Sequence, residues 1–188
     1  MKWLEEVQLE GDSIRLEPLR AEHQEALNEA AKDGDLYNLW FTSVPPPEKM
    51  EAFIATALDG FEKEHSLAFV VRELSSGKLV GSTRYLNADA INKRLEIGHT
   101  WYAKSWQGTR VNKECKLLLF QHAFETLNLH RVELEVFDFN PRAQHVYKKF
   151  GFQVEGIKRD VLLWDGKYQS AIVMSILEDD YFALQTSE

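Results

Sequence analysis

The sequence has little cysteine and no long apolar run. Cys115 is the only cysteine among the 188 residues, so no disulfide can form within the chain, and a reducing compartment is the simple interpretation. The longest apolar stretches, such as residues 117–120, are much shorter than the roughly 20 residues that cross a bilayer. The opening residues 1–10 also lack the apolar centre of a secretion signal. We therefore expect a cytoplasmic protein with no membrane partner.

Basic residues are outnumbered by acidic ones. Lys and Arg total 22 against 30 Asp and Glu, which gives a formal net charge of −8 at pH 7. A chain of this charge is poorly suited to binding nucleic acid through a basic surface. We therefore predict no nucleic-acid partner, and the acidic excess weakly favours a cationic or amine-bearing one.

Several familiar catalytic motifs are missing. The sequence contains no Gly-rich dinucleotide fingerprint, no phosphate-binding loop with its lysine, no nucleophile elbow and no His/Cys set with metal-ligand spacing. We therefore predict no metal. Cys115 falls on the apolar stripe of a predicted helix, which favours a buried structural thiol over a nucleophile.

The length fits a single domain that spans residues 1–188. Periodicity and turn residues predict strands at 13–19, 67–73, 78–85, 94–102, 131–137, 152–163 and 168–177. They predict helices at 21–32, 46–65, 109–127 and 140–151, with a short helical tail at 179–184. Three consecutive strands in the middle exclude a repeated βαβ pattern. The prediction is therefore a mixed α/β or α+β sheet with helices on its faces.

The strand at 94–102 divides its side chains between two faces by simple alternation. One face would carry Leu95, Ile97, His99 and Trp101, and the other Glu96, Gly98, Thr100 and Tyr102. A polar loop then leads directly into a helix, whose first N–H groups and dipole favour an anion. Gly108 allows close backbone approach, and Thr109, Arg110 and Asn112 add donors, so this turn is a candidate phosphate site.

A second stretch makes a family resemblance recognisable. Asn140, Ala143, Tyr147, Gly151 and Phe152 match the N-x-x-A-x-x-x-Y-x-x-x-G-F helix of the GNAT superfamily of acyl-CoA-dependent N-acyltransferases. The run from Gln107 to Asn112 is similar to that family's Q/R-x-x-G-x-G/A loop, which holds the CoA pyrophosphate with backbone amides. The chain most resembles the RimJ/RimL-like branch of ribosomal-protein N-terminal acetyltransferases and their small-molecule relatives, over about residues 14–177.

The resemblance implies the GNAT-like fold, a mixed and mostly antiparallel seven-stranded sheet with splayed central strands flanked by helices. It implies acetyl-CoA as co-substrate, with its pantetheine arm between the strands at 96–101 and 131–137. A backbone N–H on the first of these strands would polarise the thioester carbonyl. The implied cofactor-binding residues are Ile97, Gly98, His99, Thr100, Gln107, Gly108, Thr109, Arg110, Val111, Asn112, Asn140 and Arg142.

The loop departs from the family pattern at two positions. Arg110 occupies the place of the fourth-position glycine, and Asn112 that of the Gly or Ala. Either the Arg110 side chain points away or pairs with a CoA phosphate, or CoA binding is weakened. We favour the first, because the rest of the pattern is intact.

Two residues are the candidate catalytic groups. In the position that resembles the family's tyrosine, Tyr147 is the candidate general acid for the thiolate, although a core tyrosine packing the helix is the alternative. Glu96 is the candidate general base, against the alternative of an ion pair with Arg84 or Arg94. His99 is a rival that the alternation places in the core, and Glu133 and Glu135 are further candidates that the sequence does not separate.

The predicted activity is acetyl transfer from acetyl-CoA to a primary amine by direct attack in a ternary complex. The acceptor is either a protein or peptide N-terminal α-amine or a small-molecule amine, and a homodimeric assembly stays open. Residues 36–47 are the candidate specificity segment, with aromatic side chains at Tyr37, Trp40 and Phe41 and a further one at Trp101. The alternative is a catalytically degenerate acyl-CoA sensor or interaction module, prompted by Arg110.

Overall fold

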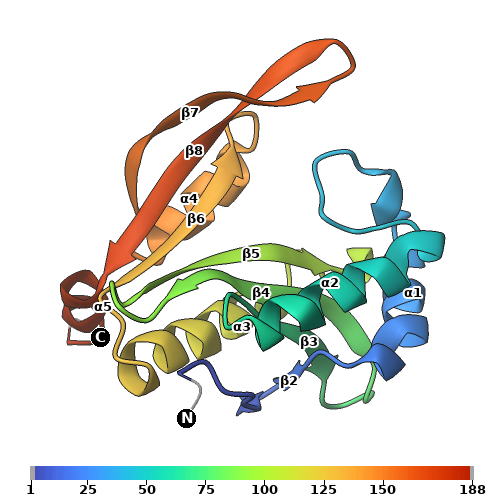
Figure 1. The fold of residues 1–188 in the computed structure, drawn as a ribbon, viewed down its shortest axis with the longest axis horizontal. Helices are drawn as coiled ribbons and strands as arrows, with labels where there is room; N and C mark the ends of the chain where they lie inside the picture. The colour runs from blue at the N-terminus through green and yellow to red at the C-terminus, as the bar shows by residue number, and fades with distance from the viewer. Residues whose placement is uncertain (1–2, 187–188) are drawn as a thin grey trace.

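Eight strands form one mixed sheet in the computed structural model, which describes residues 3–186 (Figure 1). The strand order is β1-β2-β3-β4-β5-β6-β8-β7, and only β5 and β6 run parallel. The strands are β1 (Leu9–Glu10), β2 (Ile14–Pro18), β3 (Leu67–Glu73), β4 (Leu79–Asp89), β5 (Arg94–Tyr102), β6 (Arg131–Phe137), β7 (Gln153–Trp164) and β8 (Lys167–Leu177). The predicted count of seven omitted β1, which has two residues and is too short for a periodic signal.

The helices are α1 (Gln24–Lys32), α2 (Met50–Glu62), α3 (Arg110–Gln121), α4 (Pro141–Lys149) and α5 (Glu178–Gln185). A single 3₁₀ turn precedes each of α1 and α2, where the sequence predicts one continuous helix. The predicted helix at 109–127 is α-helical only to Gln121 and continues as a π-helical turn, His122–Thr126. Among residues 3–186, no helix has the length and apolar character required to span a membrane.

Apolar side chains form one core on each face of the sheet. The core beneath α3 contains Leu95 and Ile97 of β5 together with Cys115, which is fully buried as predicted. The core beneath α1 and α2 contains Trp101 of β5 together with Leu27 and Ile54 of those helices. The central strands β3, β4 and β5 are therefore covered on both sides.

A β-bulge in β5 reverses the side-chain alternation. Trp101 pairs with Ser82, but Gly98 pairs with Arg84, so two residues of β5 lie opposite one residue of β4. His99, the first of the two, has a φ of +46°. The prediction that Trp101 shares a face with Leu95 and Ile97 is therefore wrong, because the inserted residue moves everything after it to the opposite face.

The two parallel strands in the middle of the sheet separate soon after they meet. β5 pairs with β6 at three positions only, of which Glu96–Glu133 is the last. From there β5 stays with β4, while β6 pairs along its whole length with β8. Figure 1 shows β6, β8 and β7 diverging from β5 as a separate ribbon. This separation confirms the predicted splay of the central strands.

The last two strands form the predicted hairpin. Asp165 and Gly166 join them and both have positive φ, 47° and 69°, as a primed two-residue turn requires. The hairpin extends β6 away from the rest of the sheet (Figure 1). Its tip therefore stands above the gap between β5 and β6.

Candidate functional site

A groove of about 1100 Å³ lies between α3, α4 and α5. Of the residues predicted to bind CoA or act in catalysis, those that line it are Gln107, Gly108, Thr109, Asn112, Asn140, Arg142 and Tyr147. They come from two segments, residues 107–112 and 140–147, that are 28 positions apart in the sequence. The fold therefore brings the two parts of the predicted donor site together.

The loop that enters α3 presents backbone donors at one end of this groove. Gly108 has a φ of +79°, a conformation that glycine adopts without strain. Thr109 caps α3 by accepting a hydrogen bond from the Val111 N–H at 3.3 Å and donates its own hydroxyl to the Trp106 carbonyl at 2.7 Å. The remaining N–H groups of a first helical turn have no partner inside the helix, so they can bind an anion.

The start of α4 faces the same loop. A Cβ built on Gly108 would lie 3.4 Å from Arg142 Nη2, so the guanidinium closes over the loop. Asn140 caps α4 by accepting from the Ala143 N–H at 3.1 Å. Two helix starts and one arginine therefore converge at this end of the groove, which is the chemistry that a diphosphate needs.

Two residues of the predicted loop do not contribute side chains to the groove. Arg110 is exposed at the first position of α3 and is not among the residues that line the groove. Val111 is buried in the core beneath α3, so only its backbone faces the loop. The departure of Arg110 from the family pattern therefore leaves the turn open.

Tyr147 lies on the groove wall beside a lysine that sequence reasoning missed. The Lys116 side chain on α3 is almost fully buried, with 1% of its surface exposed. Its Nζ lies 5.5 Å from the centre of the Tyr147 ring and donates to Thr100 Oγ1 on β5 at 3.1 Å. The only signal in the sequence was a charged residue next to Cys115 on the apolar stripe, which helical spacing places at the edge of the core.

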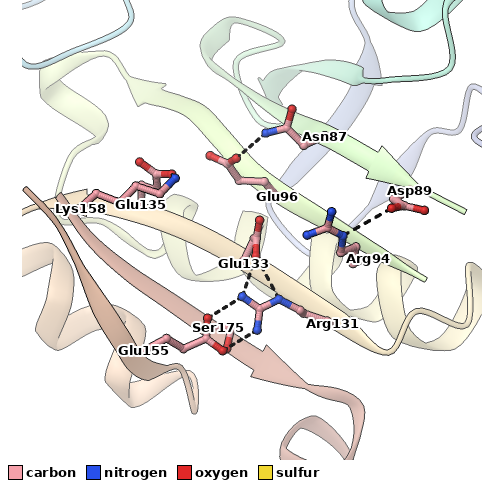
Figure 2. Close-up of polar contacts among 10 residues, drawn as sticks. All are labelled: Asn87, Asp89, Arg94, Glu96, Arg131, Glu133, Glu135, Glu155, Lys158 and Ser175. Atoms are coloured by element: carbon pink, nitrogen blue, oxygen red, sulfur yellow. Dashed lines mark hydrogen bonds and ion pairs between the residues drawn. The ribbon is translucent and has the colours of Figure 1, made fainter. Parts of the chain in front are cut away.

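Glu96 lies on the face of the sheet opposite α3. Its carboxylate accepts a hydrogen bond from Asn87 Nδ2 on β4 at 2.8 Å (Figure 2). Burial raises the pKa of Glu96, and the nearby carboxylates of Glu135 and Glu133 raise it further, against the effect of Asn87. The alternative ion pair with Arg94 does not form, because Arg94 pairs with Asp89. Glu96 is therefore a carboxylate with enhanced affinity for a proton.

The structure separates Glu96 from the two carboxylates that the sequence could not distinguish from it. Glu133 accepts from Arg131 at 2.6 Å, and Glu135 pairs with Lys158 (Figure 2). Across residues 3–186, Glu96 makes no ion pair. Of the three carboxylates, Glu96 is the one without an ion-pair partner, although the more distant charge of Lys158 lowers its pKa slightly.

The remaining predicted β5 residues lie where the strand leaves β6. His99 is turned by the bulge toward Phe53 of α2, with ring centres 5.9 Å apart, so its predicted place with Leu95 and Ile97 is wrong. Burial, helped by the charge of Arg84, lowers the pKa of His99 to about 4. Thr100 points the other way and hydrogen-bonds Thr83 Oγ1 at 2.8 Å.

The predicted specificity segment reaches the hairpin through an aromatic cluster. Trp40 stacks on Trp164 at the end of β7 with ring centres 5.4 Å apart and contacts Phe139 at 4.9 Å. Trp101 belongs instead to the core beneath α1 and α2. The loop after α1 and the tip of the hairpin therefore join above the gap between β5 and β6.

The sheet therefore parts between a groove with two helix starts on one face and Glu96, which has no ion-pair partner, on the other. The family description "Acetyltransferase (GNAT) domain" matches residues 13–153. The chain therefore belongs to the GNAT acetyltransferase family and is an N-acetyltransferase. Acetyl-CoA is the acetyl donor in this family.

The chain is similar to characterised and solved proteins over nearly its whole length. It is 27% identical to the spermidine N(1)-acetyltransferase of Escherichia coli K12 over 91% of this chain and 89% of that protein. It is 25% identical to "Putative ribosomal N-acetyltransferase YdaF" of Bacillus subtilis over 90% of this chain and 88% of that protein. A GCN5-related N-acetyltransferase of Brucella melitensis superposes with a TM-score of 0.85 at 26% identity, covering 97% and 84% of the two chains.

Within the described part of the chain, no three His, Cys, Asp or Glu residues are grouped so that they could hold a metal ion. The prediction of no metal stays a prediction.

Proposed function

We propose that this protein transfers an acetyl group from acetyl-CoA to a primary amine by direct attack in a ternary complex. The observation that carries the proposal is the separation of β5 from β6 beyond Glu96 and Glu133. Tyr147 lines the groove on the α3 side of the sheet, and Glu96 lies on the opposite side. A donor from one face and an acceptor from the other can therefore meet.

The residues of the groove fit acetyl-CoA. The loop at Gly108, the starts of α3 and α4 and the Arg142 guanidinium would hold the diphosphate. Backbone groups of β5 from Ile97 onward have no pairing with β6, so they are available to the pantetheine arm. Acetyl-CoA supplies an acetyl group activated as a thioester.

Each candidate group has a defined proton to move. Glu96 takes a proton from the acceptor amine onto its carboxylate, and its raised pKa strengthens it as a base. Tyr147 gives its hydroxyl proton to the departing sulfur. A backbone N–H near the bulge at His99 hydrogen-bonds the carbonyl oxygen as negative charge develops on it.

The acceptor is a primary amine, either a peptide N-terminus or a small molecule. Assignment to the RimJ/RimL-like branch belongs to this proposal, because relatives named for spermidine and for ribosomal acetylation match the chain at similar identity. Glu96 projects from the acceptor face without an ion-pair partner and favours a cationic amine before it loses its proton. A cytoplasmic location and a homodimer stay predictions.

The alternative of a degenerate acyl-CoA sensor depended on Arg110 obstructing the loop. Its exposed position outside the groove removes that reason. We therefore place the enzyme ahead of the sensor.

Two measurements test the proposal. Isothermal titration with acetyl-CoA is expected to give saturable binding, and the absence of any heat at millimolar ligand contradicts the donor site. Release of free thiol from acetyl-CoA is then followed with a panel that contains spermidine, simple alkylamines and short peptides. Binding without amine-dependent release would favour the sensor.

A further inference from the structure

A buried guanidinium on β4 has no partner at two of its nitrogens. Only 5% of the Arg84 surface is exposed, and within residues 3–186 its Nε and Nη2 are buried without a hydrogen-bond acceptor. Burial alone lowers the pKa of Arg84 to about 10, so the group stays charged at neutral pH. An isolated buried charge is unfavourable, and native structures usually provide it with a counter-ion.

Other unpartnered atoms lie on the same face of the sheet. Trp101 Nε1 and His99 Nδ1 are also buried without hydrogen-bond partners in the described residues. The register places Arg84 and Trp101 on one face, and the bulge turns His99 to it as well. Phe53 of α2 contacts both Arg84, at 4.9 Å from its ring centre, and His99. Two donors, the Arg84 guanidinium and Trp101 Nε1, and one imidazole nitrogen of His99 therefore share this face without hydrogen-bond partners among residues 3–186.

Partly exposed residues surround the guanidinium on the acceptor face. Phe53, Gly98 and His99 around the guanidinium are only half-buried. Gly98 lies directly opposite Arg84, and the Leu86 side chain lies over it, because a Cβ at Gly98 would lie 2.6 Å from Leu86 Cδ1. A Cβ at Gly98 would lie 3.6 Å from Glu96 Oε1, so the proposed base is the next group along the strand.

We propose that Arg84, with Trp101 Nε1, binds an anionic group of the acceptor, and that the acceptor is a short amine that carries a carboxylate. This inference rests on the proposed function and narrows its substrate class. The amine then lies at Glu96 and the carboxylate at the guanidinium, which binds such a group through two parallel N–H donors. Polyamines have no such group and leave the guanidinium unpaired.

The kinetic test compares amines of equal length with the full-length chain and acetyl-CoA. γ-Aminobutyrate and β-alanine are set against n-butylamine and n-propylamine, and aminopropylphosphonate distinguishes a phosphate-type anion from a carboxylate. The wild-type kcat/KM for the carboxylate-bearing member is expected to exceed that of the matched amine without a carboxylate by about 10-fold or more. A ratio near 1 overturns the proposal, as does a preference for the phosphonate alone.

The variants test whether Arg84 supplies the preference. Arg84→Met is expected to bring the ratio of the two kcat/KM values to about 1, and Trp101→Phe, which removes one donor but keeps an aromatic ring, to lower it partially. Arg72→Met is the matched control, because it removes an arginine that pairs with Glu17 on the neighbouring strand and should leave the ratio unchanged. Equal loss with both amines in Arg84→Met would show a structural role only.

A binding measurement separates this inference from the proposed function. Butyrate, which has the carboxylate but no amine, is titrated into the chain without acetyl-CoA. Wild type is expected to bind it, and Arg84→Met to lose that binding while keeping its affinity for acetyl-CoA. If no amine releases thiol, the proposed function is contradicted. The butyrate titration still tests whether Arg84 binds a carboxylate.

Discussion

Lys116 lies with its ammonium group 5.5 Å from the centre of the Tyr147 ring, within the range of a cation–π contact. The same nitrogen donates to Thr100 Oγ1, so one buried side chain connects α3, β5 and α4. Its positive charge lies on the side of the sheet where a thiolate would leave. We therefore expect Lys116 to position Tyr147 and to stabilise negative charge near it.

Replacement of Lys116 tests this role. Lys116→Met keeps most of the volume but removes the charge, and turnover is expected to fall roughly 10-fold or more, while the KM for acetyl-CoA changes little. Lys116→Arg keeps a charge and should recover part of the rate. Steady-state kinetics with melting temperatures measure both effects. Equal turnover in Lys116→Met and wild type would show that the charge has no part in the reaction.

Tyr147→Phe tests the general acid. The change removes one hydroxyl from a side chain whose ring packs on Phe152, so the packing should survive. We expect turnover to fall about 100-fold, within the usual range for loss of a general acid, with the Kd for acetyl-CoA nearly unchanged. Calorimetry and thiol release measure these separately. An unchanged rate would remove the acid role.

Glu96→Gln tests the general base, and pH provides a second readout. Only the carboxylate form accepts a proton, so wild-type kcat/KM should fall as pH drops through the raised pKa of Glu96. The variant should lose most activity and lack this limb. Glu133→Gln is the control, because Glu133 is already paired with Arg131 and should affect stability more than rate. A limb near pH 4 that survives in Glu96→Gln would point to His99 instead.

Gly108→Ala tests the donor loop. Both Gly108 and Gly77 have positive φ, 79° and 70°, so an alanine at either position costs about 1 kcal/mol of stability. A Cβ at Gly77 meets nothing within 4 Å, which makes Gly77→Ala a matched control for backbone strain. Acetyl-CoA affinity should fall in Gly108→Ala alone. Equal affinity in both variants would contradict a close approach of the donor to this loop.

The lowered pKa of Glu73 predicts how acid changes the stability that the β3–β4 hairpin contributes. Hydrogen bonds from the side chains of Ser75 and Ser76 and from their backbone N–H groups lower the pKa of Glu73 to about 2. A lowered pKa gives stability that is present above the ordinary carboxyl pKa and is lost as pH falls through the folded value. Glu73→Gln should therefore be less stable than wild type at pH 7, with the gap closing toward pH 2. Denaturant unfolding across pH measures this, and a gap independent of pH would contradict it.

The local sequence pattern was sufficient to predict most helices and strands and the loop that enters α3. The strands at 67–73, 94–102 and 131–137 agree with the structure at both ends, because turn residues and polar residues bound each apolar run. The helix cap at Asn140 and the turn at Asp165–Gly166 likewise follow from the residue types at those positions. These features depend on neighbours within a few positions.

The β-bulge at His99 could not be predicted from the alternation of apolar and polar residues. A period of two assumes one residue opposite one residue, and the sequence carries no mark of where β4 and β5 lose that register. The faces assigned to His99 and Trp101 were wrong for this reason. The same bulge turns His99 toward the face that carries Arg84, so the further inference also depends on it.

By itself the sequence determined the order of the elements, the loop that opens α3 and the helix that carries Tyr147, since each follows from propensity, capping and spacing along the chain. Only the tertiary structure decided which carboxylate has no ion-pair partner, because Lys158 of β7 reaches Glu135 of β6 across strands, whereas Arg131 pairs with Glu133 on the same strand. It also decided that Lys116 and Arg84 are buried charges, since burial depends on which elements pack over a side chain.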